Sequence, residues 1–136
     1  MILVDTSVWV DWLRGTATTE VRALESVLDN GLPFGITGVI YQEILQGADS
    51  PASLDRLADY FGSQRFYNPE DPVTTNRRAA ELYQACRGQG ITIRSTIDCL
   101  VAQIALEHGL MLLHSDRDFE RMREAAPELR FFSTAP

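Results

Sequence analysis

The sequence predicts an α/β fold, with a mainly parallel central sheet flanked by helices. Short apolar runs alternate along the chain with longer segments in which apolar residues recur at helical spacing. This alternation is typical of parallel sheets, because the connection between two parallel strands usually contains a helix. At 136 residues, with no repeat or linker, the chain has the size of one domain, and we expect that domain to span residues 1–136.

The first half of the chain contains apolar runs that are followed by helical patterns. Residues 1–4 are apolar and end at Asp5, which predicts a buried strand, and residues 34–36 predict a second strand. Thr6 and Ser7 are residue types that favour helix N-caps. We expect helices at residues 8–13, 18–30, 37–47 and 50–61, the last with a core-facing stripe formed by Leu54, Leu57, Ala58 and Phe61.

The second half begins with a weak strand candidate at residues 65–67 and a turn at residues 68–72. A helix then reaches Cys86 and ends near Gly88. Ser95 is expected to cap the most regular helix, whose inward residues are Ile97, Leu100, Val101, Ile104 and Ala105. The remaining predicted elements are a strand at residues 110–113, a helix at 116–123 and a strand at 129–132.

Charge and cysteine content exclude several classes of protein. Nineteen acids and twelve bases give a net charge of −7, whereas non-specific nucleic-acid binders are usually basic. Every base is an arginine, and the absence of lysine excludes enzymes that need a Schiff-base amine or a P-loop lysine. Cys86 and Cys99 do not form a CxxC pair, so zinc and thioredoxin-like sites have no support, and we expect free thiols.

The chain shows no membrane or export signal. No apolar run approaches the roughly 20 residues that span a bilayer. The start, Met1 to Asp5, lacks the basic region of a signal peptide. We therefore expect no membrane segment and a cytoplasmic location. In the cytoplasm, buried thiols stay reduced.

Four acidic residues fall where an α/β fold can bring them together. Ligands of open parallel sheets bind beyond the carboxyl ends of the strands. Asp5 and Asp116 come just after predicted strands. Asp98 lies in the first turn of a helix, and Glu43 lies on the helix that follows the second strand. Acids gathered at one edge repel one another unless a cation compensates them, and oxygen ligands without His or Cys indicate Mg²⁺ or Mn²⁺.

Each acid also has a structural explanation. Helix capping, a turn or a solvated helix face would account separately for Asp5, Asp98, Asp116, Asp118 and Glu43. These explanations do not account for the joint placement of the acids. His108 and His114 are isolated histidines without ligand spacing, and we assign them no role.

Three blocks of sequence carry the acids, and their spacing and order are fairly specific when taken together. They are MILVDTSVWVDWLRG at the start, ITGVIYQEILQGA in the middle, and IRSTIDCLVAQIALEHGLMLLHSDRDFERM near the end. Together they resemble PIN-domain ribonucleases, and most of all the VapC toxins of bacterial toxin–antitoxin pairs. The resemblance covers nearly the whole chain and implies a PIN-like fold.

The resemblance implies a set of site residues. The catalytic and metal-binding acids of the family motif fall on Asp5, Glu43, Asp98 and Asp116. Asp116 and Asp118 are spaced so that either fits the position of the fourth acid, and we favour Asp116. Asp118 is then the candidate for a fifth acid. Ser7, or Thr6, matches the hydroxyl that supports the first acid in the family.

Three arginines lie close in sequence to the acid-bearing segments. They are Arg14, Arg94 and Arg117. Because guanidinium groups bind phosphate well, these arginines are candidates for contacts with RNA. A solvated surface position would explain each of them equally well.

The resemblance also implies an activity and partners. It implies an Mg²⁺- or Mn²⁺-dependent endoribonuclease that acts on tRNA or other single-stranded or looped RNA, forms a homodimer and is neutralised by a cognate VapB-type antitoxin. The chemistry is consistent, because a divalent ion lowers the pKa of a bound water and offsets charge in phosphoryl transfer. Glu43 is the candidate for orienting or deprotonating that water.

Two alternatives compete with this interpretation. Haloacid-dehalogenase-like phosphatases and receiver domains also carry an aspartate after the first strand, but both normally rely on a lysine, which this chain lacks. The former also needs a second aspartate where Ser7 stands. The other alternative is a PIN-like RNA- or protein-binding module without significant nuclease activity, although all four acid positions are occupied.

Overall fold

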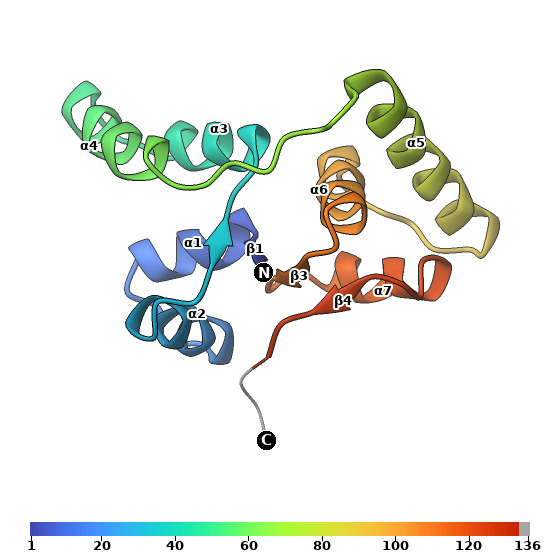
Figure 1. Ribbon diagram of the computed structural model, residues 1–136, viewed down its shortest axis with the longest axis horizontal. Helices are drawn as coiled ribbons and strands as arrows, with labels where there is room; N and C mark the ends of the chain where they lie inside the picture. The colour runs from blue at the N-terminus through green and yellow to red at the C-terminus, as the bar shows by residue number, and fades with distance from the viewer. Residues whose placement is uncertain (134–136) are drawn as a thin grey trace.

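The computed structural model describes residues 1–133, so the end of the predicted domain 1–136 lies outside the described residues. Its strands are β1 (Ile2–Val4), β2 (Phe34–Gly35), β3 (Met111–Leu113) and β4 (Arg130–Phe131). They form one sheet in the order β2, β1, β3, β4, and each neighbouring pair is parallel. The predicted α/β class with a parallel central sheet is confirmed (Figure 1).

The register of the sheet places two distant segments beside each other. In β1, Leu3 is paired with Gly35 on one side and with Leu112 on the other. Just beyond β1, the backbone N–H of Asp5 donates to the carbonyl of Leu113 at 2.9 Å. The chain therefore leaves β1 and β3 at the same edge of the sheet, where ligands of parallel sheets bind.

Helices flank this sheet in the order that the sequence predicts (Figure 1). Within residues 1–133 they are α1 (Thr6–Leu13), α2 (Thr19–Asp29), α3 (Gly38–Gln46), α4 (Pro51–Gly62), α5 (Pro72–Gly88), α6 (Thr96–Glu107) and α7 (Arg117–Ala125). α3 packs against α4 and α1, while α5 packs against α6 and α7. The predicted helices are confirmed, with small differences at their ends.

Two helix starts differ from the predictions made from residue type. α1 already includes Thr6 and Ser7, because its N-cap is Asp5, whose side chain accepts the backbone N–H of Ser7. Ser95 does precede α6, but its side chain makes no capping hydrogen bond. The first turn of α6, which carries Asp98, therefore has no side-chain cap from Ser95.

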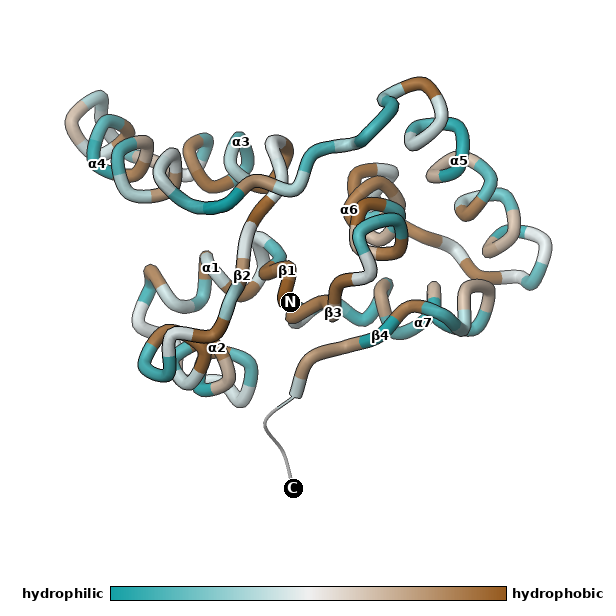
Figure 2. Tube along the Cα trace, viewed as in Figure 1, coloured by the Kyte–Doolittle hydropathy of each residue, from teal (hydrophilic) through white to brown (hydrophobic). Residues whose placement is uncertain are grey.

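The core lies between the strands and the inner faces of the helices. Figure 2 shows hydrophobic residues along β1 and β3 and over most of α6. The largest fully buried side chains are Trp9, Phe61 and Phe119. The indole Nε1 of Trp9 donates to the carbonyl of Val4 at 3.2 Å, so burial of this ring satisfies its polar atom.

Two residues of the predicted core-facing stripes are exposed. Leu54 is 42% exposed, whereas Phe61 of the same stripe is fully buried. Ile97 is 36% exposed, because it lines an open groove between α5 and α6. Helical spacing predicts a face, but not how far the neighbouring helix covers it.

The strand predicted weakly at residues 65–67 does not form, so that prediction is wrong. Only Phe66 forms a parallel bridge, with Ile36. Two backbone hydrogen bonds of 2.8–2.9 Å hold this segment beside Ile36 before the chain turns away. Across residues 1–133, no helix has both the length and the apolar surface to cross a membrane.

Candidate functional site

Asp5 is buried at the carboxyl end of β1. Its Oδ2 accepts hydrogen bonds from the backbone N–H of Ser7 at 3.0 Å and from the Ser7 hydroxyl at 2.7 Å. The Ser7 Oγ also accepts the backbone N–H of Ser115 at 3.0 Å. Ser7 therefore orients the Asp5 carboxylate and ties it to the segment that follows β3.

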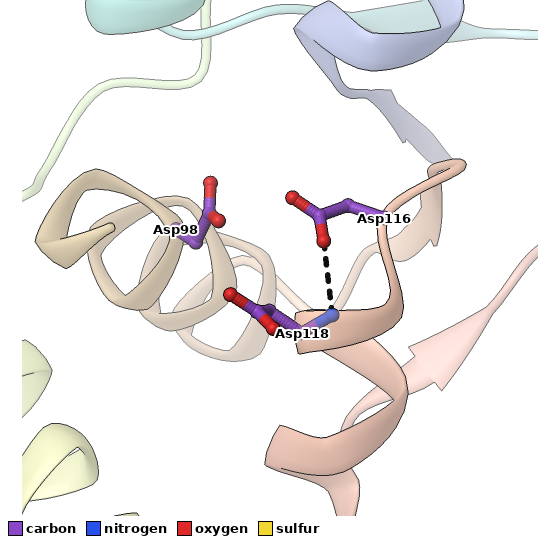
Figure 3. Close-up of side chains that lie close together, drawn as sticks. All are labelled: Asp98, Asp116 and Asp118. Atoms are coloured by element: carbon purple, nitrogen blue, oxygen red, sulfur yellow. Dashed lines mark hydrogen bonds between the residues drawn. The ribbon is translucent and has the colours of Figure 1, made fainter. Parts of the chain in front are cut away.

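Three carboxylates from two helices converge next to this segment (Figure 3). Asp98 comes from the first turn of α6, Asp116 is the N-cap of α7, and Asp118 lies in the first turn of α7. One oxygen of each lies within 4.8 Å of the others. The Asp116 Oδ1 accepts the backbone N–H of Asp118 at 3.0 Å, which fixes two of the three relative to each other (Figure 3).

Asp98 has an unusual electrostatic environment. Its pKa is raised to about 7, first by burial and then by the negative charges of Asp5, Asp116, Asp118 and Glu43. Among the described residues, no donor forms a hydrogen bond with its carboxylate. A carboxylate without a hydrogen-bond donor, surrounded by like charges, favours a cation as its partner.

Glu43, on α3, interacts electrostatically with the same acids. Its Oε1 accepts the hydroxyl of Thr6 at 2.7 Å. It is not one of the three converging acids, but its charge raises the pKa of both Asp98 and Asp5. The pKa of Asp5 is raised chiefly by burial, and the hydrogen bonds from Ser7 oppose this increase. Thr6 and Ser7 therefore each orient a different acid.

Asp118 is the most deeply buried of the three converging acids, at 1% exposure. Its Oδ2 accepts the backbone N–H of Arg94 at 3.0 Å and the Arg94 Nε at 3.3 Å. The Arg94 guanidinium also contacts the Asp116 Oδ1 at 3.3 Å. Asp116 and Asp118 both lie beside Asp98, and Asp118 additionally anchors the loop before α6 to α7.

An open cavity of about 590 Å³ borders these acids. Asp116 and Asp118 line it, together with Arg94 and Arg117. Arg14 is not at this cavity; it lines a separate groove formed by α1, α3 and α4. Of the three arginines predicted for RNA contacts, the structure thus places two beside the acids.

Sequence reasoning missed two residues near the site. Arg121 lines the acid-bordering cavity and lies four residues after Arg117 on α7, a spacing that puts both on one helix face. His114, to which we assigned no role, is buried, and its Nδ1 accepts the backbone N–H of Asp116 at 3.1 Å. Burial lowers the pKa of His114, which is consistent with a neutral ring that accepts at Nδ1.

The donor set fits a hard divalent cation. The three converging groups are carboxylates, a chemistry that matches Mg²⁺ or Mn²⁺. Burial and, after it, the mutual repulsion of these acids raise the pKa of Asp98, and such an ion would relieve the repulsion. Asp98, Asp116 and Asp118 are therefore the residues that can hold a metal, with Asp5 and Glu43 close enough to act on its ligands electrostatically.

The sequence matches the family model of the PIN domain over residues 2–125. It is 39% identical to the VapC ribonuclease Mb1587 of Mycobacterium bovis over 126 residues, which cover 88% of this chain and 90% of that protein.

Solved structures share the fold at lower identity. VapBC2 from Rickettsia felis, crystallised with a DNA fragment from its promoter, gives a TM-score of 0.73 at 19% identity, covering 97% of this chain and 98% of that chain. A toxin–antitoxin complex from Klebsiella pneumoniae gives a TM-score of 0.65 at 20% identity, covering 88% and 90%. With its family match, its close relative and its fold in agreement, the chain belongs to the PIN domain family and, within it, to the VapC ribonucleases.

Proposed function

We propose that this protein is a metal-dependent endoribonuclease that acts as the toxin of a toxin–antitoxin pair. The observation that carries the proposal is the convergence of Asp98, Asp116 and Asp118 at the edge of a parallel sheet. The relative in Mycobacterium bovis is named a ribonuclease, which supports RNA as the substrate. We propose tRNA or another single-stranded or looped RNA, and a cytoplasmic site of action.

The proposed roles of the acids follow from their contacts. Asp98, Asp116 and Asp118 would hold Mg²⁺ or Mn²⁺, which would lower the pKa of a bound water and compensate charge on the phosphate. The Ser7 hydroxyl orients the Asp5 carboxylate, which adds negative charge at the same edge of the sheet. Glu43, oriented by the Thr6 hydroxyl, would accept a proton from the attacking water. Attack by water leaves a 5′-phosphate and a 3′-hydroxyl.

The proposed partners rest on the solved relatives of this fold. Both structures described above are complexes, one of VapBC2 and one of a toxin with its antitoxin. We therefore propose a VapB-type antitoxin as the partner that neutralises this protein. A homodimer is the proposed state of the free protein, which light scattering on the purified chain would test.

Cleavage of an RNA pool by the purified protein tests the activity. With Mg²⁺ or Mn²⁺ we expect discrete fragments that disappear in EDTA. Asp98→Asn should lower the rate by more than about 100-fold, because loss of even an indirect metal partner costs 10- to 100-fold. Asp55→Asn is the matched control, since Asp55 is exposed on α4, away from the acids.

The outcome separates an enzyme from a binding module. Fragments that form equally well with Asp98→Asn would contradict the assigned site. A folded protein that cuts no RNA at any metal concentration, but still binds RNA or a protein partner, would instead indicate a PIN-like module without nuclease activity.

A further inference from the structure

The cavity beside the acids is also lined by positively charged residues. Asp116 and Asp118 line it together with Arg94, Arg117 and Arg121. Its volume of about 590 Å³ is within the usual range for cavities that bind small ligands. One cavity thus carries both carboxylates, which favour a cation, and guanidinium groups, which favour an anion.

The three arginines are not equivalent. Arg94 is held by Asp116 and Asp118 through its guanidinium, although its side chain is 74% exposed. Within residues 1–133, no carboxylate lies within 4.0 Å of the guanidinium of Arg117 or Arg121. Arg117 and Arg121 are therefore the pair whose hydrogen-bond donors stay available to a ligand.

Two glutamates share the α7 face that carries the arginine pair. Arg117, Glu120, Arg121 and Glu124 follow one another at the i, i+3, i+4 and i+7 positions of one helix face. Glu120 is directed to His114, with 3.5 Å between its Oε1 and the His114 Nε2. Within residues 1–133, neither glutamate forms an ion pair with Arg117 or Arg121, so both guanidinium groups keep an uncompensated positive charge.

We propose that Arg117 and Arg121 form a subsite for a backbone phosphate of single-stranded nucleic acid, next to the phosphate that is cut. The proposal rests on the nuclease function proposed above. The two positions are about 6 Å apart along the helix axis, and guanidinium groups bind phosphate oxygens in a bidentate manner. The subsite also explains how a chain of net charge −7 holds a polyanion.

Fluorescence anisotropy of a labelled single-stranded RNA in EDTA tests this subsite, since no metal-dependent cleavage occurs there. Arg117→Gln and Arg121→Gln should each weaken binding about ten-fold at low salt. Each should also reduce the slope of log K against log salt by about 0.7, the value for one phosphate contact on a single strand. Arg56→Gln, which removes an exposed charge on α4, should change neither quantity.

Cleavage kinetics with Mg²⁺ make the two proposals distinguishable. We expect Arg121→Gln to raise KM while kcat stays nearly unchanged, because the arginine contacts a phosphate that does not react. The subsite is overturned if the wild-type protein cleaves RNA while both variants keep the wild-type KM and salt slope. It is also overturned if the wild-type protein binds no RNA in EDTA. Arginine-dependent binding by a protein that cleaves no RNA would support the subsite and contradict the nuclease.

Discussion

At the scale of single residues, small hydroxyls orient the acids. The Ser7 hydroxyl donates a hydrogen bond to the Asp5 carboxylate, and the Thr6 hydroxyl donates one to the Glu43 carboxylate. These adjacent residues at the start of α1 belong to different hydrogen-bonded pairs, so neither substitutes for the other. Among the residues that the structure describes, no such donor contacts Asp98, whose carboxylate is placed by the first turn of α6.

The raised pKa of Asp98 predicts an inverted pH dependence of stability in EDTA. Between the ordinary pKa of 3.8 and about 7, folded Asp98 retains a proton that the unfolded chain has released. Its contribution to the free energy of unfolding is therefore fully present at low pH and is lost as the pH rises through about 7. Thermal melts in EDTA at several pH values should show this loss between about pH 4 and 7.

The Asp98→Asn variant isolates this contribution. An amide has no proton to lose in this range, so the melting temperature of the variant should vary less with pH and should exceed that of the wild type near pH 8. Asp55→Asn serves as the control. Equal loss of stability on raising the pH in wild type and Asp98→Asn would contradict the environment described for Asp98.

At the scale of elements, periodicity and cap types located the helices well. The hydrophobic spacing on α6 is regular, and that helix is buried along most of its length. The exposure of Ile97 was not predictable, because it depends on how closely α5 approaches α6. The same holds for Arg121, since only the folded position of α7 beside the cavity distinguishes it from other exposed arginines.

The site could be predicted in part for a related reason. Asp5 and Asp116 follow strands, and parallel strands place such residues at one edge. Spacing alone could not separate Asp116 from Asp118, because both lie where α7 begins. The contacts of Asp118 with the Arg94 backbone join segments that are far apart in sequence, so no local pattern encodes them.

The close packing of β2 gives a prediction at the scale of elements. A Cβ added at Gly35 would lie 2.6 Å from the carbonyl oxygen of Arg65 and from the ring of Tyr67. Gly35→Ala should therefore lower the free energy of unfolding by about 1–3 kcal/mol, as measured by urea titration. Gly88→Ala is the control, because nothing lies within 4 Å of a Cβ at that position. Similar stability of the two variants would contradict the packing.

At the scale of the whole molecule, the acids couple metal binding to folding. Within residues 1–133 they come from α3, α6 and α7 and from the cap residues Asp5 and Asp116, so an ion bound between them stabilises only the folded chain. Arg94 partly replaces such an ion when it neutralises Asp116 and Asp118.

Mg²⁺ should therefore raise the melting temperature. At one hundred times the dissociation constant we expect an increase of roughly 10 °C, measured by differential scanning calorimetry. The double variant Asp5→Asn, Asp98→Asn should lose this increase. Arg94→Gln should enlarge the increase in melting temperature, because the Arg94 guanidinium would no longer compete with the metal for Asp116 and Asp118. An unchanged melting temperature of the wild type at saturating Mg²⁺ would exclude metal binding by the acids.

The hydrogen bond from Ser115 to Ser7 spans almost the entire chain. Two of the three converging acids, Asp116 and Asp118, lie beyond it. During synthesis on a ribosome, a nascent chain that already contains β1 and α1 has only an incomplete set of ligands. The carboxylates meet only after α7 has left the exit tunnel, so a growing chain cannot assemble the acid cluster before this helix has been made.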